Sequence, residues 1–287
     1  MKNIPVRKIA TSQKIENPQG KFSIRPVSDI LKGEDIIHDL HRHDFYFILA
    51  IDKGDGIHEI DFTKFDVVNM SVFILRPGQV HYLELKKNSQ GFLIEFDAAF
   101  YKPNDPNAVE RLKKATKKNF CKVNSDKFNL LFASLNNIYR EFTDKQEDYI
   151  EVIKANLDIF FIEHIRQSQR IDHTNQHSNN YNQERFEELT ELLESRIAEL
   201  KTVSQYAEIL NLSVYQLNAI TKAIVGKTVS DLINDQILLE AKRYLLATSN
   251  QVKDIAYHLG YEDVSYFIRF FKKHTNSSPE AYRQKFK

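Results

Sequence analysis

Between residues 20 and 97, apolar residues come in short runs separated by turn residues. Some runs are continuously apolar, such as 45–51, and others nearly alternate with polar residues, such as 57–62. Lengths of four to eight residues suit strands better than helices. The runs are residues 45–51, 57–62, 72–75, 81–85 and 91–96. Many short strands with turns about every ten residues predict a β-sandwich or a β-barrel.

After Pro106 the apolar residues recur at steps of three and four, which predicts helices. One stripe comprises Phe128, Leu131, Phe132, Leu135, Ile138, Tyr139 and Phe142, and a second comprises Ile150, Ile153, Leu157, Phe160, Phe161 and His164. Such a helix pair can be core or a dimer seam, and the pattern leaves both open. We expect residues 126–167 to mediate a homodimer.

Residues 168–183 are rich in Asn, Gln and His and nearly lack aliphatic side chains. A segment of this composition cannot bury enough apolar surface to become ordered by itself. We interpret it as a linker between two domains, residues 1–167 and residues 184–287.

The second domain is predicted to be helical throughout, and it contains an internal repeat. Ser213 with Gln216 and Thr228 with Asp231 have the spacing of capping boxes. Residues 203–232 and 252–282 align with each other, so that Ala207 meets Ala256 and Lys222 meets Lys272. Each copy is a short helix, a tight turn at Asn211 or Gly260, and a second helix, which is the pattern of a helix-turn-helix.

The second helix of the later copy has two different faces. Its apolar face comprises Val264, Phe267, Ile268 and Phe271. Arg269, Lys272 and Lys273 lie on or beside the opposite face. A recognition helix needs an apolar stripe that holds it and a polar stripe that enters the major groove.

Charge is distributed unevenly along the chain, although the net charge is only +1. Residues 266–287 contain six Lys and Arg against one acid, Glu280, whereas residues 184–200 contain six Glu against two Arg. A local basic patch can neutralise DNA phosphates without a basic chain overall.

Targeting and covalent features are few. The single Cys121 cannot form an internal disulfide, which fits a reducing compartment. The first residues lack the apolar core of a signal peptide, and no run approaches the roughly 18 apolar residues of a membrane span. We expect a cytoplasmic protein with no membrane partner.

The last hundred residues resemble the AraC/XylS-type transcription regulators. The resemblance rests on Ile255-Ala256, Gly260-Tyr261, Ser265-Tyr266-Phe267, Arg269, Phe271-Lys272-Lys273, Pro279 and Tyr282-Arg283. It implies two helix-turn-helix units joined by a long helix at about residues 230–246, with two recognition helices in successive major-groove segments of promoter DNA. RNA polymerase is a further candidate partner.

This resemblance also implies which residues contact DNA. The candidates are Tyr215, Asn218, Ala219 and Lys222 in the first unit and Glu262, Val264, Ser265, Ile268, Arg269, Lys272 and Lys273 in the second. Val264 and Ile268 cannot hydrogen-bond bases but could contact thymine methyl groups. The family often has a basic residue at Ala219 and an Arg at Gln236, so the first unit is expected to make fewer charge contacts.

The N-terminal residues resemble the double-stranded β-helix of cupin sensor domains. The matching residues are His41-Arg42-His43, Gly54-Asp55-Gly56 and the stretch from Arg76 to His81. Metal-binding cupins add a Glu, but Phe47 and Ile48 stand where it would fall. We therefore expect no metal and no cofactor. The alternative is a site of His41, His43 and His81 for Zn, Fe or Ni, which could make the protein a metal-dependent enzyme with a DNA-binding tail.

A small-molecule sensor is the favoured function of the N-terminal domain. The candidate pocket residues are His43, Tyr46, Phe73 and His81, with Ile48, Phe92 and Ile94 also expected to face the cavity. In the alternative, the barrel is filled by its own side chains and only dimerises.

The expected fold is therefore α+β with two domains: a cupin-like β-barrel with a helical pair, then an all-α domain of two helix-turn-helix units. The expected function is sequence-specific transcription regulation in response to an effector, without enzymatic activity.

Overall fold

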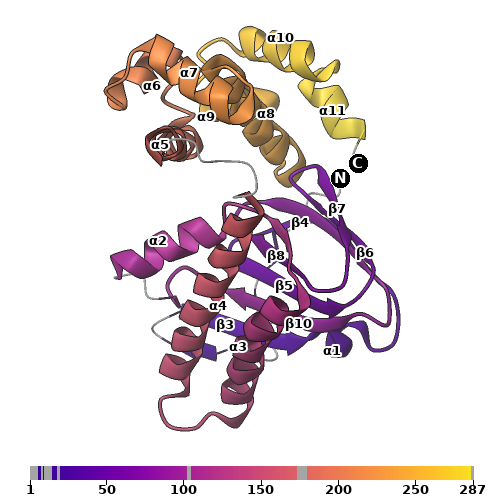
Figure 1. Ribbon diagram of the computed structural model, residues 1–287. Helices are drawn as coiled ribbons and strands as arrows, with labels where there is room; N and C mark the ends of the chain where they lie inside the picture. The colour runs from indigo at the N-terminus through magenta and orange to yellow at the C-terminus, as the bar shows by residue number, and fades with distance from the viewer. Residues whose placement is uncertain are drawn as a thin grey trace. The chain divides into compact units, whose positions relative to one another are not determined.

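The computed structural model describes residues 6–7, 9, 15–17, 20–101, 105–172 and 180–285 (Figure 1). Its contacts divide the chain into two compact units, an N-terminal unit within residues 5–175 and a C-terminal unit within residues 176–287. Among the described residues, no helix is both long enough and apolar enough to cross a membrane.

The N-terminal unit contains two β-sheets. The smaller sheet has the order β1-β4-β9-β6-β7, with β1 (Val6–Arg7), β4 (Ile36–His43), β9 (Val80–Leu85), β6 (Gly56–Ile60) and β7 (Thr63–Val67). The larger has the order β11-β8-β5-β10-β3-β2, with β11 (Phe120–Lys122), β8 (Ser71–Leu75), β5 (Tyr46–Lys53), β10 (Gln90–Phe96), β3 (Gly20–Pro26) and β2 (Ile15–Asn17). Neighbouring strands pair antiparallel, except that β1 pairs parallel with β4.

The described strands form a two-sheet sandwich, so the expected closed barrel is corrected. Each sheet ends at edge strands, and no described ladder joins the edges of one sheet to those of the other. The space between the sheets is filled by one hydrophobic cluster, to which β5 contributes Phe47, Leu49 and Ile51. Ile48 and Ala50 point to the opposite side, because successive residues of a strand face opposite sides of the sheet.

Three helices follow the strands: α2 (Pro106–Ala115), α3 (Ser125–Asp144) and α4 (Tyr149–Asp172); a short α1 (Val27–Leu31) precedes β4. The antiparallel pair α3 and α4 packs over the outer face of the larger sheet (Figure 1). The apolar stripe of α3 is core: Phe128, Leu131, Leu135, Ile138 and Phe142 are buried there. These side chains are therefore unavailable for a dimer seam.

The C-terminal unit contains seven helices among the described residues: α5 (Asn180–Arg196), α6 (Val203–Ile209), α7 (Val214–Val225), α8 (Val229–Ala247), α9 (Val252–His258), α10 (Val264–Thr275) and α11 (Pro279–Lys285). The pairs α6–α7 and α9–α10 are the two helix-turn-helix units, and α8 joins them. The expected capping boxes are formed by Ser213 with Gln216 and by Thr228 with Asp231.

Small buried residues allow close helix packing in both helix-turn-helix units. Ala207 of α6 and Ala256 of α9 are buried at equivalent positions. Tyr261, in the second turn, packs against the hydrophobic clusters of both units. The two units therefore share a core through this side chain.

The expected linker, residues 168–183, partly coincides with helix. Helix α4 continues to Asp172 and α5 begins at Asn180. Residues 173–179 lie outside the described residues.

Candidate nucleic-acid interface and sensor site

Helix α10 presents a basic face to solvent. Asp263 caps its N-terminus, where its carboxylate accepts a hydrogen bond from Ser265 N at 2.7 Å. Phe267 and Phe271 are fully buried on the opposite side. The exposed residues at and after the cap are Glu262, Asp263, Ser265, Tyr266, Arg269, Lys272, Lys273 and His274.

Arg269 lies near the centre of this exposed face, and its side chain is 71% exposed. One guanidinium nitrogen lies 3.8 Å from the carboxylate of Asp263. An ion pair this long and this exposed contributes little to stability, so it does not lock the side chain. Arg269 is therefore placed to reach a ligand outside the protein.

The exposed face also contains Tyr266, which sequence reasoning missed. Its side chain is 57% exposed and its ring centroid lies 5.9 Å from that of Tyr261. The helical period could have identified it, since it lies one turn before Phe270 and beside Arg269.

Val264 and Ile268 do not lie freely on that face. Both side chains are half-buried and pack against the cluster that holds α10. Arg283, counted with the basic patch from the sequence, donates instead to the carbonyls of Leu245 (2.9 Å) and Asn250 (2.6 Å). It connects α11 to the end of α8.

Helix α7 presents a much less charged face. Tyr215 is 83% exposed, and Lys222 is exposed one turn before the C-terminal cap, Gly226. Ala219 and Ala223 are exposed at the positions equivalent to Arg269 and Lys273.

The side chain of Asn218 is committed to contacts within the unit. Its Nδ2 donates to the carbonyl of Val214 at 3.0 Å, and its Oδ1 accepts from Val229 N at 3.0 Å. Asn218 thus connects α7 to the start of α8, and a base-reading role for it would require these bonds to break.

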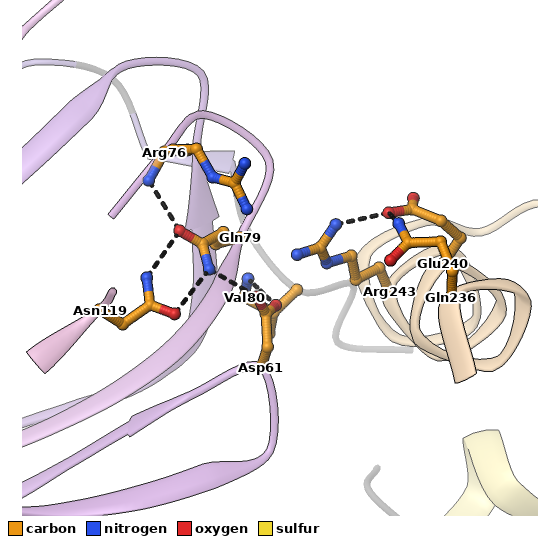
Figure 2. A network of polar contacts seen from close by, with 8 residues as sticks. All are labelled: Asp61, Arg76, Gln79, Val80, Asn119, Gln236, Glu240 and Arg243. Atoms are coloured by element: carbon orange, nitrogen blue, oxygen red, sulfur yellow. Dashed lines mark hydrogen bonds and ion pairs between the residues drawn. The ribbon is translucent and has the colours of Figure 1, made fainter. Parts of the chain in front are cut away.

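On α8, Gln236 occupies the position where the resemblance led us to expect a basic residue. Its Nε2 donates to Glu240 at 3.5 Å, and Glu240 also accepts from Arg243 (Figure 2). These side chains are half-buried, so the polar row of α8 is occupied with its own contacts.

The N-terminal unit buries a cluster of four histidines between its sheets. His41 and His43 come from β4, His58 from β6 and His81 from β9, and each is at most 5% exposed. His81 is central: its Nδ1 lies 2.8 Å from His58 Nε2, and its Nε2 lies 2.8 Å from His43 Nε2. Sequence reasoning missed His58, although its alternation with Ile60 could have placed it on the inner face.

Burial keeps the centre of this cluster neutral. It lowers the pKa of His58 to about 3, and the neighbouring His41 adds to this shift. Burial also holds the pKa of His81 well below its usual range, with smaller contributions from His58, His41 and His43. At neutral pH both imidazoles therefore have one proton and one lone pair.

Three of the four candidate pocket residues lie together. His43 and His81 belong to the cluster, and the ring of Phe73 lies 4.8 Å from that of His58. Tyr46 is a correction, because it points to the helix-covered face of the larger sheet and stacks on Phe96. Ile48, Phe92 and Ile94 lie on that same face.

A buried amide network lies beside the strand that bears His81. Gln79 donates to Asp61 at 2.6 Å and exchanges hydrogen bonds with Asn119, which also donates to the carbonyl of Ile74 (Figure 2). Asp61 in turn accepts from Val80 N at 3.2 Å. The network fixes the start of β9, and hence the position of His81.

Comparison with known proteins agrees with both halves of this description. Residues 206–285 match the family described as "Helix-turn-helix domain", and residues 32–104 match "AraC-like ligand binding domain". The chain is 25% identical to the HTH-type transcriptional activator RhaS of Pectobacterium carotovorum, over 85% of this chain and 86% of the relative. It is 24% identical to the activator RhaR of Mannheimia succiniciproducens, over 86% of this chain and 87% of the relative.

Among solved structures, unsaturated fatty acid bound ToxT of Vibrio cholerae is 18% identical, with a TM-score of 0.43, covering 94% of this chain and 96% of that one.

Two exposed recognition helices on a shared core, preceded by a two-sheet ligand-binding fold, define a DNA-binding regulator. The chain belongs to the AraC-type transcription regulators, with an AraC-like ligand-binding unit and a helix-turn-helix unit.

Proposed function

We propose that this AraC-type regulator contacts promoter DNA through the exposed faces of α10 and α7, and that α10 supplies most of the charge. The observation that carries the proposal is the row Arg269, Lys272 and Lys273 opposite the buried Phe267 and Phe271. Cations in such a row neutralise phosphates, while an Arg at the centre can donate two hydrogen bonds to a guanine. On α7, Tyr215 and Ala219 suit apolar contact with thymine methyl groups, and Lys222 suits a phosphate.

Replacing Arg269 by Ala is expected to reduce affinity for the selected DNA site by about 1–3 kcal/mol. The site itself would first be obtained by selecting tight-binding duplexes from random DNA with the full-length protein. Affinity would then be measured by fluorescence anisotropy at several salt concentrations. Lys64→Ala removes an exposed cation from β7 of the other unit and serves as the matched control, with unchanged affinity. Equal affinities of R269A and wild type would remove Arg269 from the interface.

We infer that two copies of the chain pair through the outer side of α3 and α4. The apolar stripes of these helices are buried in the core, but Leu130, Val152 and Ile159 remain exposed on them. The outer sides of the two helices are joined by Asn137 and Asn156, whose side chains meet at 3.5 Å. This is a mixed apolar and neutral polar surface, which suits a homodimer contact better than a charged one would.

The double variant Leu130→Arg/Ile159→Arg is expected to sediment as a monomer at concentrations where the wild type sediments as a dimer. Both side chains are half exposed, so the fold of each protomer should persist, as judged by circular dichroism. Asn136→Arg adds a charge elsewhere on the exposed surface of α3 and is expected to leave the dimer intact. A monomeric wild type would contradict the proposal.

We further propose a cytoplasmic regulator whose sensor lies within residues 5–175 and whose DNA-binding unit lies within residues 176–287. A small-molecule effector would bind near His43, Phe73 and His81, and RNA polymerase would be the partner at the promoter. Linkage gives the test of the effector: DNA must change effector affinity by the same factor by which the effector changes DNA affinity. An effector whose affinity is the same with and without DNA would not be a regulator of this protein.

A further inference from the structure

The histidine cluster between the sheets has the arrangement of a metal site. We propose that His41, His43 and His81 bind one divalent transition-metal ion through their imidazole nitrogens, and that His58 orients His81. This inference goes beyond the proposed function, because ion binding requires neither DNA nor a small-molecule effector.

The spacing of the three imidazoles carries the first part of the argument. One nitrogen from each ring lies within 4.8 Å of the others, and all three residues are buried. A tetrahedral ion about 2.0–2.1 Å from each nitrogen separates the nitrogens by roughly 3.4 Å. His43 Nε2 and His81 Nε2 face each other at 2.8 Å, so opening this pair by about 0.6 Å would admit the ion between them.

The hydrogen bonds behind the rings carry the second part. His41 Nδ1 lies 2.6 Å from the carbonyl oxygen of Asp39, and a carbonyl can only accept, so this nitrogen carries the ring proton. Its Nε2 is thereby left with the lone pair that a metal needs. Metal-ligating histidines regularly have such a partner behind the ligating ring.

His58 provides the corresponding partner for His81. When His81 Nδ1 donates its proton to His58 Nε2, at 2.8 Å, His81 Nε2 is the nitrogen with the free lone pair. His58 is fully buried, and its Nδ1 has no hydrogen-bond partner among the described residues. His58 therefore acts through His81, as a positioning residue.

The donor set indicates the class of ion. Among the described residues the cluster offers three imidazole nitrogens and includes no carboxylate or thiolate. Imidazole ligands suit Zn²⁺, Cu²⁺ or Ni²⁺, whereas Mg²⁺ and Ca²⁺ require oxygen. Phe45 and Phe47 pack against His43, with ring centroids 4.3 Å and 5.3 Å away, and shield the cluster from water.

Cobalt titration of the full-length, chelator-stripped protein tests the site, because Co²⁺ in a nitrogen site gives a visible ligand-field spectrum. One Co²⁺ per chain should bind and be displaced by Zn²⁺. His43→Gln and His41→Gln should abolish the spectrum. His58→Ala should weaken binding about 10–100-fold, as expected for loss of a partner behind a ligand, and His58→Gln should restore part of it.

His38→Gln is the matched control, since His38 lies on the same strand, outside the three-nitrogen group, and should leave binding unchanged. Circular dichroism verifies that each variant is folded. Should the ligand variants unfold, histidine-ring NMR of the wild type replaces them: one equivalent of Zn²⁺ should shift the ring signals of His41, His43 and His81. Absence of stoichiometric binding, binding retained in both ligand variants, or unshifted ring signals would each overturn the proposal.

Discussion

Gly260→Ala is expected to destabilise the C-terminal unit by roughly 3–5 kcal/mol and to abolish DNA binding at 37 °C. Gly260 forms the turn between α9 and α10 with φ +75, where a side chain already costs about 1 kcal/mol. A Cβ there would also lie 1.8 Å from the carbonyl oxygen of Ala198, just after α5. Backbone on both sides must then move, and the turn that orients α10 would be displaced.

Gly226→Ala separates these two costs. Gly226 caps α7 with φ +70, but a Cβ there would meet nothing within 4 Å. Only the cost of the left-handed backbone remains, so the expected loss is about 1 kcal/mol. Chemical denaturation of the two variants measures the difference directly. Similar losses in both would mean that the approach of Gly260 to Ala198 contributes nothing.

Acidification from pH 7.5 to pH 5 is expected to cost the N-terminal unit about 2 kcal/mol through His164 alone. The ring is 1% exposed on α4 and lies parallel to Phe160. Burial lowers the pKa of His164 to about 4; the Ala115 backbone partly offsets the shift and Lys118 adds to it. The unfolded chain, with an ordinary pKa near 6.5, therefore takes up the proton first. Stability is complete above about pH 6.5 and falls as the pH decreases towards 4.

His164→Leu should remove this part of the pH dependence, whatever it does to stability at neutral pH. Urea denaturation at pH 7.5 and pH 5 gives the difference for each protein. Gln167→Leu changes a buried polar residue one turn further along α4 that cannot titrate, so it should keep the wild-type pH dependence. If His164→Leu loses as much stability on acidification as wild type, the proton is taken up elsewhere.

Features set by neighbouring residues were predictable from the sequence. The capping boxes at Ser213 and Thr228 depend on a partner three residues away, and both form as expected. The buried Phe267 and Phe271 and the exposed Arg269 follow from the helical period alone. The joining helix, expected at residues 230–246, is observed as Val229–Ala247.

Features set by distant residues were not predictable. Asn218 is occupied because Val229 offers it a backbone N–H across a turn. Tyr46 begins a continuous apolar run, which gives no indication of which residues face inwards, and its true face appears only once the helices cover one side. Arg283 is withdrawn from the basic patch by two carbonyls that the fold brings to it.

The alanines on the exposed face of α7 have a consequence for how such a regulator can change its targets. Ala219 and Ala223 occupy the central positions of a recognition helix without making contacts that the fold needs. Longer side chains can be introduced there at little cost to the helix, since Ala, Arg, Lys and Gln are all good helix formers. New base preferences can thus arise in α7 while α10 keeps the protein on DNA, which leaves one half of the recognition surface free to evolve.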